Sequence, residues 1–302
     1  MNNLLHPITF SIPIEKIIIN IPNKLKLVSD LIPGKIETYI YNTEEDYYKE
    51  YQKSYFALTF KKGGWDCLRH YEIIANGCIP YFSEIEKCPN NTLHLFPKKL
   101  ILKGNEMFDK FNLIGINNLT DNDKNNYNDL LKELLDFLRK NLTTESIAKY
   151  ILNKSNKINC SKILYLSGNI MPDYLRCLTL HGFKSIFGNN CHDYPKINHI
   201  YKNENISYSN LYGKGITYTN LLSSELHDDK LDIDILNLIK NKYFDVIIYG
   251  SFSRGMPFYE KIKNIYDSND IILLYGEDEP SQLDYFYNLL IKGHHIFVRE
   301  LI

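Results

Sequence analysis

Short apolar runs alternate with stretches of helical periodicity along most of the chain. In the first half, the apolar run YFALTF at 55–60 precedes a helical pattern at 66–76, and the run CIPYF follows at 78–82. In the second half, the predicted strands are 162–168, 183–188, 244–250, 270–276 and 294–301, and the predicted helices are 172–182, 232–243, 257–268 and 281–293. Such an alternation is typical of α/β proteins with a mostly parallel sheet covered on both faces.

The remaining segments predict two units. Residues 14–21 and 35–42 are β-branched or aromatic enough to predict strands, and 44–54 predicts a helix. A polar linker at 121–129 precedes two helical patterns, 130–142 and 143–154, with Thr144 as the expected N-cap of the second. The unpatterned polar segment that follows places a boundary near residue 156. We therefore expect two Rossmann-like domains, 1–155 and 156–302, facing a cleft.

Composition excludes several classes of protein. Of 302 residues, 44% are hydrophobic and 24% are charged, which is ordinary for a globular protein, and the net charge of -1 argues against a nucleic-acid binder. No run of 18 apolar residues occurs, so we expect no membrane span and a cytoplasmic location. The six cysteines form no C-x-x-C pair, which argues against a zinc site or disulfide framework built from them. We attribute the 24 tyrosines to coding bias.

The segment KKGGWDCLRHYEIIANGCIPYF, residues 61–82, carries the candidate chemistry. The turn at its start contains Lys61, Lys62, Gly63 and Gly64. In the helix that follows, one face presents Asp66, Arg69, Glu72 and Asn76 at steps of three and four residues. A glycine turn that leads into a helix favours anions, because the free amides of the helix start point outward. The alternative is that Arg69 and Glu72 form only an exposed ion pair, worth about 0.3 to 0.5 kcal/mol.

Residues 54–89 resemble the exostosin-type nucleotide-sugar-binding region of GT-B glycosyltransferases. The resemblance rests on an apolar strand, a basic glycine-containing turn, the Arg69-x-x-Glu72 helix and the strand Gly77-Cys78-Ile79-Pro80, in that order. It implies transfer of a sugar from a nucleotide-diphosphate sugar to a glycan or another acceptor, without a required metal or other cofactor, although a divalent metal is possible. It also implies that Glu72 holds a donor hydroxyl, and that Arg69, Lys61 and Lys62 neutralise the diphosphate.

The order of the domains departs from that family. In GT-B enzymes the donor domain is usually C-terminal, whereas this motif lies in the first half of the chain. Either the domain order is reversed here, which we favour, or the resemblance is local and the chemistry lies in the second half.

The second half contains its own candidates. The turn after 244–250 carries Ser251, Ser253 and Arg254. These residues either contact an acceptor or a phosphate, because ligands bind at strand ends in open α/β sheets, or form an ordinary turn between a strand and a helix. Asp173, after the strand 162–168, is the candidate general base. The acidic group Glu277 to Glu279 is the alternative, since a GT-A transferase uses such a group to hold a metal on the diphosphate.

Two functions other than glycosyl transfer also fit the sequence. The chain is either a nucleotide- or sugar-binding module without turnover, or an α/β enzyme of unrelated chemistry in which Arg-x-x-Glu occurs by coincidence. Release of nucleoside diphosphate from a sugar donor separates the transferase from both.

Overall fold

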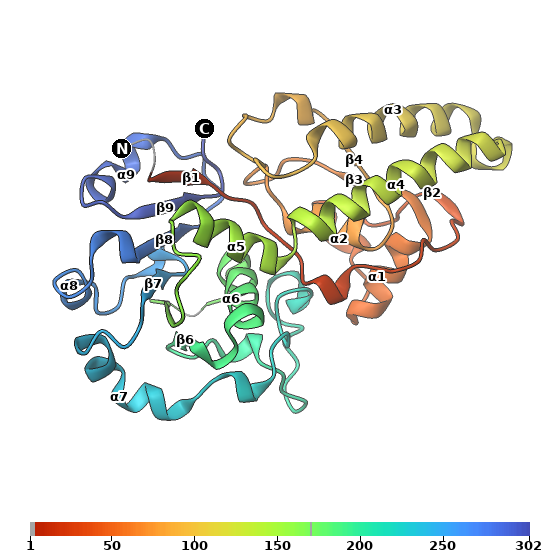
Figure 1. Ribbon diagram of the computed structural model, residues 1–302. Coiled ribbons are helices and arrows are strands. Elements are labelled where there is room, and N and C mark those ends of the chain that lie inside the picture. Colours follow the sequence, from red (N-terminus) through yellow and green to blue (C-terminus); the bar gives the residue numbers. More distant parts are fainter. Residues whose placement is uncertain (1–3, 170) are drawn as a thin grey trace.

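The fold contains two parallel β-sheets (Figure 1). The computed structural model describes residues 4–169 and 171–302. The larger sheet has the strand order β1-β9-β8-β7-β5-β6 and the smaller one β2-β3-β4, and every pairing in both is parallel. The larger sheet consists of β1 (Leu5–Pro7), β5 (Ile163–Leu166), β6 (Cys191–Tyr194), β7 (Val246–Tyr249), β8 (Ile271–Tyr275) and β9 (His295–Val298). The smaller consists of β2 (Lys26–Val28), β3 (Ser54–Thr59) and β4 (Ile79–Phe82).

Helices cover both faces of the larger sheet. The helices of the smaller part are α1 (Glu44–Gln52), α2 (Leu68–Ala75), α3 (Lys98–Ile114) and α4 (Asp121–Asn141). Those of the larger part are α5 (Thr144–Lys154), α6 (Tyr174–Phe187), α7 (Asp229–Lys240), α8 (Tyr259–Ile262) and α9 (Leu283–Leu290). Along β5, Ile163 and Tyr165 pack in the same core as α5 and α6, whereas Leu164 and Leu166 pack with α7, α8 and α9. This alternation explains why the strands are apolar on both faces.

The helix α6 differs from its prediction because of one glycine. The sequence predicts a helix that ends at Gly182 and a strand at 183–188, but α6 continues to Phe187. A Cβ atom at Gly182 would lie 2.1 Å from the carbonyl oxygen of Thr144, at the start of α5. Gly182 is therefore a point of close approach between two packed helices, and it does not end α6.

The N-terminal strand predictions are wrong. The predicted strands 14–21 and 35–42 contain only short 3-10 turns, at Ile14–Lys16 and Ile36–Thr38. The strands in this region are β1 and β2, which are three residues long and give little periodic signal.

Two helix starts also differ from the sequence prediction. The predicted linker 121–129 is the first part of α4, which begins at a capping box formed by Thr120 and Asp123. The N-cap of α5 is Thr143, one residue before the predicted Thr144. Both starts have the side-chain oxygen acceptor that a helix N-terminus requires.

The chain begins in the larger sheet and then crosses to the smaller part (Figure 1). β1 pairs with β9, so the first strand belongs to the same sheet as the last one. A single apolar core extends from Phe56 in β3 to Tyr165 in β5, and it joins the two parts. The α/β class and the parallel sheets are confirmed; the GT-B arrangement and the division into 1–155 and 156–302 stay predictions. No helix in the described part of the chain combines the length and apolar character needed to cross a membrane.

Candidate ligand site between the two sheets

The segment that follows β3 contacts the carboxyl end of β9. The backbone amides of Trp65 and Asp66 donate to the two carboxylate oxygens of Glu300, at 3.0 and 2.8 Å. The guanidinium of Arg299 donates to the carbonyl oxygen of Asp66 and pairs with Glu300 and Asp278. The backbone amides that the sequence predicts to bind a ligand anion therefore already bind the carboxylate of Glu300.

The two glycines of the turn allow this close approach. A Cβ atom at Gly64 would lie 2.5 Å from Oε1 of Glu300, and one at Gly63 would lie 2.7 Å from Oδ2 of Asp278. Gly64 is buried and Gly63 is exposed. Gly64 thus has a packing role, whereas the donor-binding roles predicted for both glycines stay predictions.

Lys61 and Lys62 lie at the surface beside this contact. Both side chains are exposed, and neither forms an ion pair with a carboxylate in the described part of the chain. Lys61 lies over the ring of Trp65, with its Nζ 5.4 Å from the ring centroid. Both lysines are therefore accessible to a ligand from solvent, as their predicted role requires.

Asp66 faces the core and not the ligand side of α2. Its carboxylate accepts hydrogen bonds from the amide of Phe10 at 2.7 Å and the hydroxyl of Tyr71 at 2.9 Å. Burial raises the pKa of Asp66 to about 7, although the nearby Arg299 acts in the opposite direction. Asp66 is a structural carboxylate at the contact between the two sheets.

Glu72 is buried at the boundary of the two parts, only 6% exposed. Its carboxylate accepts hydrogen bonds from Tyr47 in α1, at 2.9 Å, and from Thr217 in the larger part, at 2.5 Å. Burial raises the pKa of Glu72, while these hydrogen bonds and the charge of Arg69 lower it. The alternative of an exposed Arg69–Glu72 ion pair does not describe this buried side chain.

Arg69 has no hydrogen-bond partner for two of its nitrogens. Nε and Nη1 are shielded from solvent, and neither is satisfied within the described residues. The guanidinium lies over the ring of Tyr39, 5.9 Å from its centroid. Because a desolvated charged donor without a partner is costly, Arg69 is the polar group here that most clearly lacks an acceptor.

Asn76, the fourth residue of the predicted stripe, has internal partners only. It is buried, its amide donates to the carbonyl of Glu72 at 2.9 Å, and its oxygen accepts from Gln52 at 3.0 Å. The observed helix ends one residue earlier, and Asn76 is its C-cap. Its predicted contact with a donor stays a prediction.

The candidates of the second half meet at the strand-order switch of the larger sheet. The chain leaves β5 towards β6 on one side and towards β7, β8 and β9 on the other, so the crevice at the carboxyl ends of β5 and β7 is where such sheets bind ligands. Ser251 is buried there, and its hydroxyl, like that of Ser167, has no partner among the described residues.

Arg254 joins Asp173 to Glu277. Its Nε lies 3.3 Å from Oδ2 of Asp173 and 3.5 Å from Oε1 of Glu277, which also accepts from Ser253 at 2.8 Å. Asp173 is the N-cap of α6 and accepts from the amide of Arg176 at 2.9 Å. In this conformation an ion pair and a backbone amide therefore hold the carboxylate of Asp173.

The loop after β8 connects the two groups of candidates. Glu277 faces Arg254, and the next residue, Asp278, faces Gly63 and Arg299. On the other side, Tyr174, which follows Asp173 at the start of α6, packs edge-on against Tyr218, the neighbour of the Thr217 that bonds to Glu72. The candidates from both halves therefore lie around one contact region between the sheets. We call this region the junction; it comprises residues 61–72, Asp173, Thr217, 251–254, Glu277, Asp278, Arg299 and Glu300.

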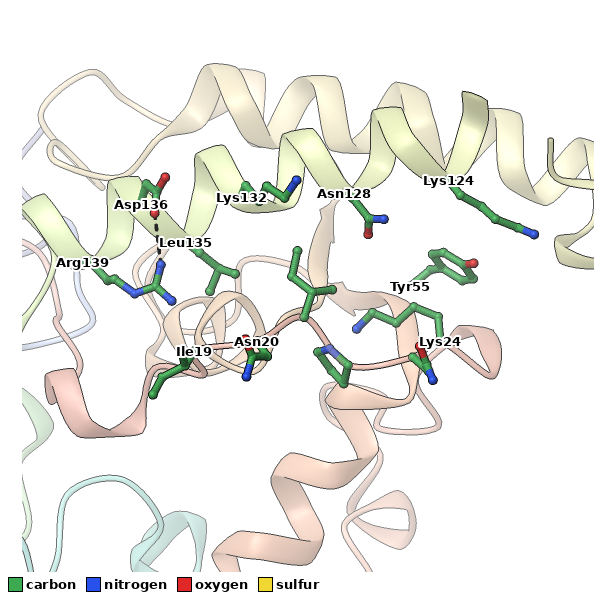
Figure 2. A pocket seen from close by; sticks show the side chains of 13 residues that line it. Ile19, Asn20, Lys24, Tyr55, Lys124, Asn128, Lys132, Leu135, Asp136 and Arg139 are labelled. Atoms are coloured by element: carbon green, nitrogen blue, oxygen red, sulfur yellow. Dashed lines mark hydrogen bonds and ion pairs between the residues drawn. The ribbon is translucent and has the colours of Figure 1, made fainter. Parts of the chain in front are cut away.

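A separate hollow lies at the amino end of the smaller sheet (Figure 2). It has a volume of about 690 Å³, and its basic side chains are Lys24, Lys124, Lys132 and Arg139. Arg139 is bonded to Asp136 and to the carbonyl of Ile18, and Lys24 to the carbonyls of Gln52 and Gly77. Burial lowers the pKa of Lys24 to about 8. The hollow is basic, but Arg139 and Lys24 already have acceptors, and Lys132 pairs with Asp129 at 3.5 Å.

Searches against protein-family models, curated proteins and solved structures find no match to this chain. The functional proposal therefore depends on the residues of the junction.

Sequence reasoning missed the tyrosines around Glu72. Tyr47 donates to Glu72 and bonds to Tyr51 at 2.9 Å, and Tyr48 bonds to Thr217 at 2.7 Å. All three tyrosines are on α1 and buried. Their spacing in EEDYYKEYQ, one face of a short helix, was a usable signal, but an overall excess of tyrosine concealed it.

Proposed function

We propose that this protein is a glycosyltransferase of the GT-B type that binds a nucleotide-diphosphate sugar at the junction. The observation that carries the proposal is the guanidinium of Arg69, whose Nε and Nη1 are shielded from solvent and lack an acceptor among the described residues, next to the buried carboxylate of Glu72. A diphosphate supplies the missing acceptor oxygens, and a sugar or ribose hydroxyl suits the carboxylate.

In the proposed transfer, different residues of the junction stabilise the leaving group and accept the proton. The acceptor oxygen bonds to the anomeric carbon, while the bond from that carbon to the diphosphate breaks and its electron pair stays on the diphosphate. Arg69, assisted by Lys61 and Lys62, stabilises the charge that develops there. Asp173 is the proposed base for the acceptor proton, once the acceptor or the donor phosphate has drawn Arg254 away from it.

The proposal requires a conformational step. The nitrogens of Arg69 are shielded from solvent, and the hydroxyl of Thr217 occupies the carboxylate of Glu72. The donor reaches both groups when the segment that carries Thr217 moves away, and closure over the donor would then exclude water from the reaction.

A binding module without turnover is the second candidate. It is favoured by Glu300, because Glu300 already binds the amides of Trp65 and Asp66, and these amides are then not free to stabilise the charge on a leaving diphosphate. The GT-A alternative has less support, since Glu277 lies beside Arg254 and Asp278 beside Arg299.

Donor hydrolysis separates these functions. The protein is incubated with a panel of nucleotide-diphosphate sugars, and release of nucleoside diphosphate is measured with and without chelator. We expect release from at least one donor that persists in chelator, at a temperature at which circular dichroism shows the chelated protein to be folded. Binding without release supports the module, and loss that manganese restores supports the GT-A alternative.

A further inference from the structure

A cluster of side chains that can bind a metal lies at the β6 edge of the larger sheet, outside the junction. His192 in β6, Asp232 in α7 and His227, just before α7, each contribute one ligand atom, and these atoms all lie within 4.8 Å of one another. Nε2 of His192 lies 2.8 Å from Oδ1 of Asp232, and Nε2 of His227 lies 3.2 Å from Oδ2. Asp229 adds an oxygen 3.5 Å from Nε2 of His227.

A second layer of contacts orients His227. Its Nδ1 lies 2.9 Å from the carboxylate of Asp193, which also contacts Lys184 at 2.9 Å and accepts from Tyr201 at 2.5 Å. A carboxylate that holds Nδ1 of a histidine leaves Nε2 free to bind a metal, and this pairing recurs behind protein zinc ligands. Lys184 neutralises Asp193, so Asp193 needs no further cation.

We propose that His192, His227 and Asp232 form a structural zinc site, with Asp229 or water as the fourth ligand. Two imidazole nitrogens and carboxylate oxygens are a donor set that Zn²⁺ accepts. Neighbouring ligand atoms around a tetrahedral zinc are separated by roughly 3.3 Å. The distances from Asp232 to the two imidazole nitrogens, 2.8 and 3.2 Å, are close to this value, whereas the stacked rings of His192 and His227 would have to turn to direct both Nε2 atoms at one ion.

The position of the cluster explains what a metal would stabilise. Residues 195–228 connect β6 to α7 with only short 3-10 turns and one isolated bridge, between Tyr201 and Leu222. Such a long irregular connection loses much conformational entropy when it is ordered, and a metal that joins its two ends lowers that cost. The same connection carries Thr217, so its order is linked to the junction.

Metal content and stability of the full-length protein test the site. The protein is stripped with chelator, titrated with Zn²⁺, and separately with Co²⁺, whose visible absorption reports tetrahedral coordination. We expect about one equivalent of Zn²⁺, a tetrahedral Co²⁺ spectrum, a higher melting temperature with metal and slower hydrogen exchange at 201–226. Asp193→Asn is expected to weaken zinc binding by about 10- to 100-fold.

Matched variants decide between zinc and a metal-free network. His192→Ala and the conservative Asp232→Asn should lose the bound metal, whereas His94→Ala, at an exposed histidine outside the cluster, should keep it. Zinc uptake by the wild-type protein that equals that of Asp232→Asn, or an unchanged melting temperature on loading, would overturn the proposal. His227 would then bridge Asp193 and Asp232 as an imidazolium.

Discussion

The junction and the basic hollow of Figure 2 are two places where an anion could bind, and they differ in how far their cations are already satisfied. In the hollow, Arg139 and Lys24 donate to a carboxylate and to backbone carbonyls. In the junction, Arg69 is desolvated and two of its nitrogens have no acceptor. The hollow has volume and positive charge. Of the two regions, the junction is the one in which the described residues leave buried donors of an arginine unsatisfied, and a ligand that accepts from them would remove the free-energy cost of burying them.

The location of each region also favours the junction as the anion site. The hollow lies at the amino end of the smaller sheet, beside Lys24 and Tyr55, whereas the junction lies at the carboxyl ends of strands in both sheets. Ligands of open parallel sheets bind at the carboxyl ends. The size of a hollow is therefore a poorer guide here than topology and unsatisfied hydrogen bonds.

Arg299→Met should have the largest effect, because it removes the cation at the centre of the junction. The side chain of Arg299 is fully buried, and its loss leaves Asp66 and Glu300 without their counter-ion. We expect a loss of about 3 to 5 kcal/mol in the free energy of unfolding, measured with urea. Lys87→Met, which breaks an exposed pair with Glu84, should change it by less than about 1 kcal/mol. Equal effects of the two variants would contradict this account of the junction.

Arg69→Met should separate function from stability. We expect donor turnover to fall about 100-fold, or about 2.7 kcal/mol, because the charge that stabilises the leaving diphosphate is lost. The melting temperature should change little, since the cost of burying a charge without a hydrogen-bond acceptor offsets its attraction to Glu72. The matched variant in the hollow, Arg139→Met, should keep turnover within about threefold. The reverse ranking would assign the anion site to the hollow.

Glu72→Gln should reduce donor turnover by about tenfold or more, because a neutral amide is a weaker acceptor for a donor hydroxyl than a carboxylate. Glu72→Ala should in addition lose about 1 to 3 kcal/mol of stability, because the hydroxyls of Tyr47 and Thr217 lose their acceptor. Glu50→Gln is the control, since Glu50 is an equally buried carboxylate of the smaller part, bonded to Tyr41. Wild-type turnover in folded Glu72→Gln would remove Glu72 from the site.

Asp66 should make stability fall as pH rises from about 4 to about 7. Its pKa is about 7 in the folded protein and near its usual value of 3.8 when unfolded, so the folded state binds the proton more tightly within this window. The slope contributed by one such group is at most about 1.4 kcal/mol per pH unit. Urea unfolding across this range should show a smaller slope for Asp66→Asn. Equal slopes would mean that Asp66 does not hold a proton at the junction.

Lys62→Ala should have the smallest effect. The side chain is exposed, so stability should change by less than about 0.5 kcal/mol. Affinity for a nucleoside diphosphate should fall about threefold at low salt and approach the wild-type value at high salt, as for a screened surface charge. Calorimetric titration measures this, with Lys132→Ala in the hollow as the control. An effect from Lys132 alone would again favour the hollow.

The central strands and their parallel class could be predicted from the sequence, because YFALTF, DVII and IILL are continuous apolar runs bounded by glycine or polar residues. The edge strands β1 and β2 could not, since three residues give no period. The extent of α6 was also hidden, because Gly182 has the composition of a helix end but serves a helix crossing that depends on α5.

The candidate site was predictable only as a set of residue types. The grouping of Arg69 with Glu72 follows from helical spacing, and the structure keeps both at the junction. That Glu300 would occupy the amides of Trp65 and Asp66 could not be predicted, since it depends on a contact across most of the chain. The same holds for Thr217, which comes from an irregular connection with no periodic signal.

Hydrogen exchange with and without nucleoside diphosphates tests the central claim most directly, because it reports both regions in one experiment. With uridine, guanosine, adenosine and cytidine diphosphates in turn, the account predicts that at least one slows exchange at 61–76 and at 250–256, while 19–24 and 124–139 stay unchanged. Protection confined to 19–24 and 124–139, or no protection by any of the four, would contradict a nucleotide-sugar site at the junction.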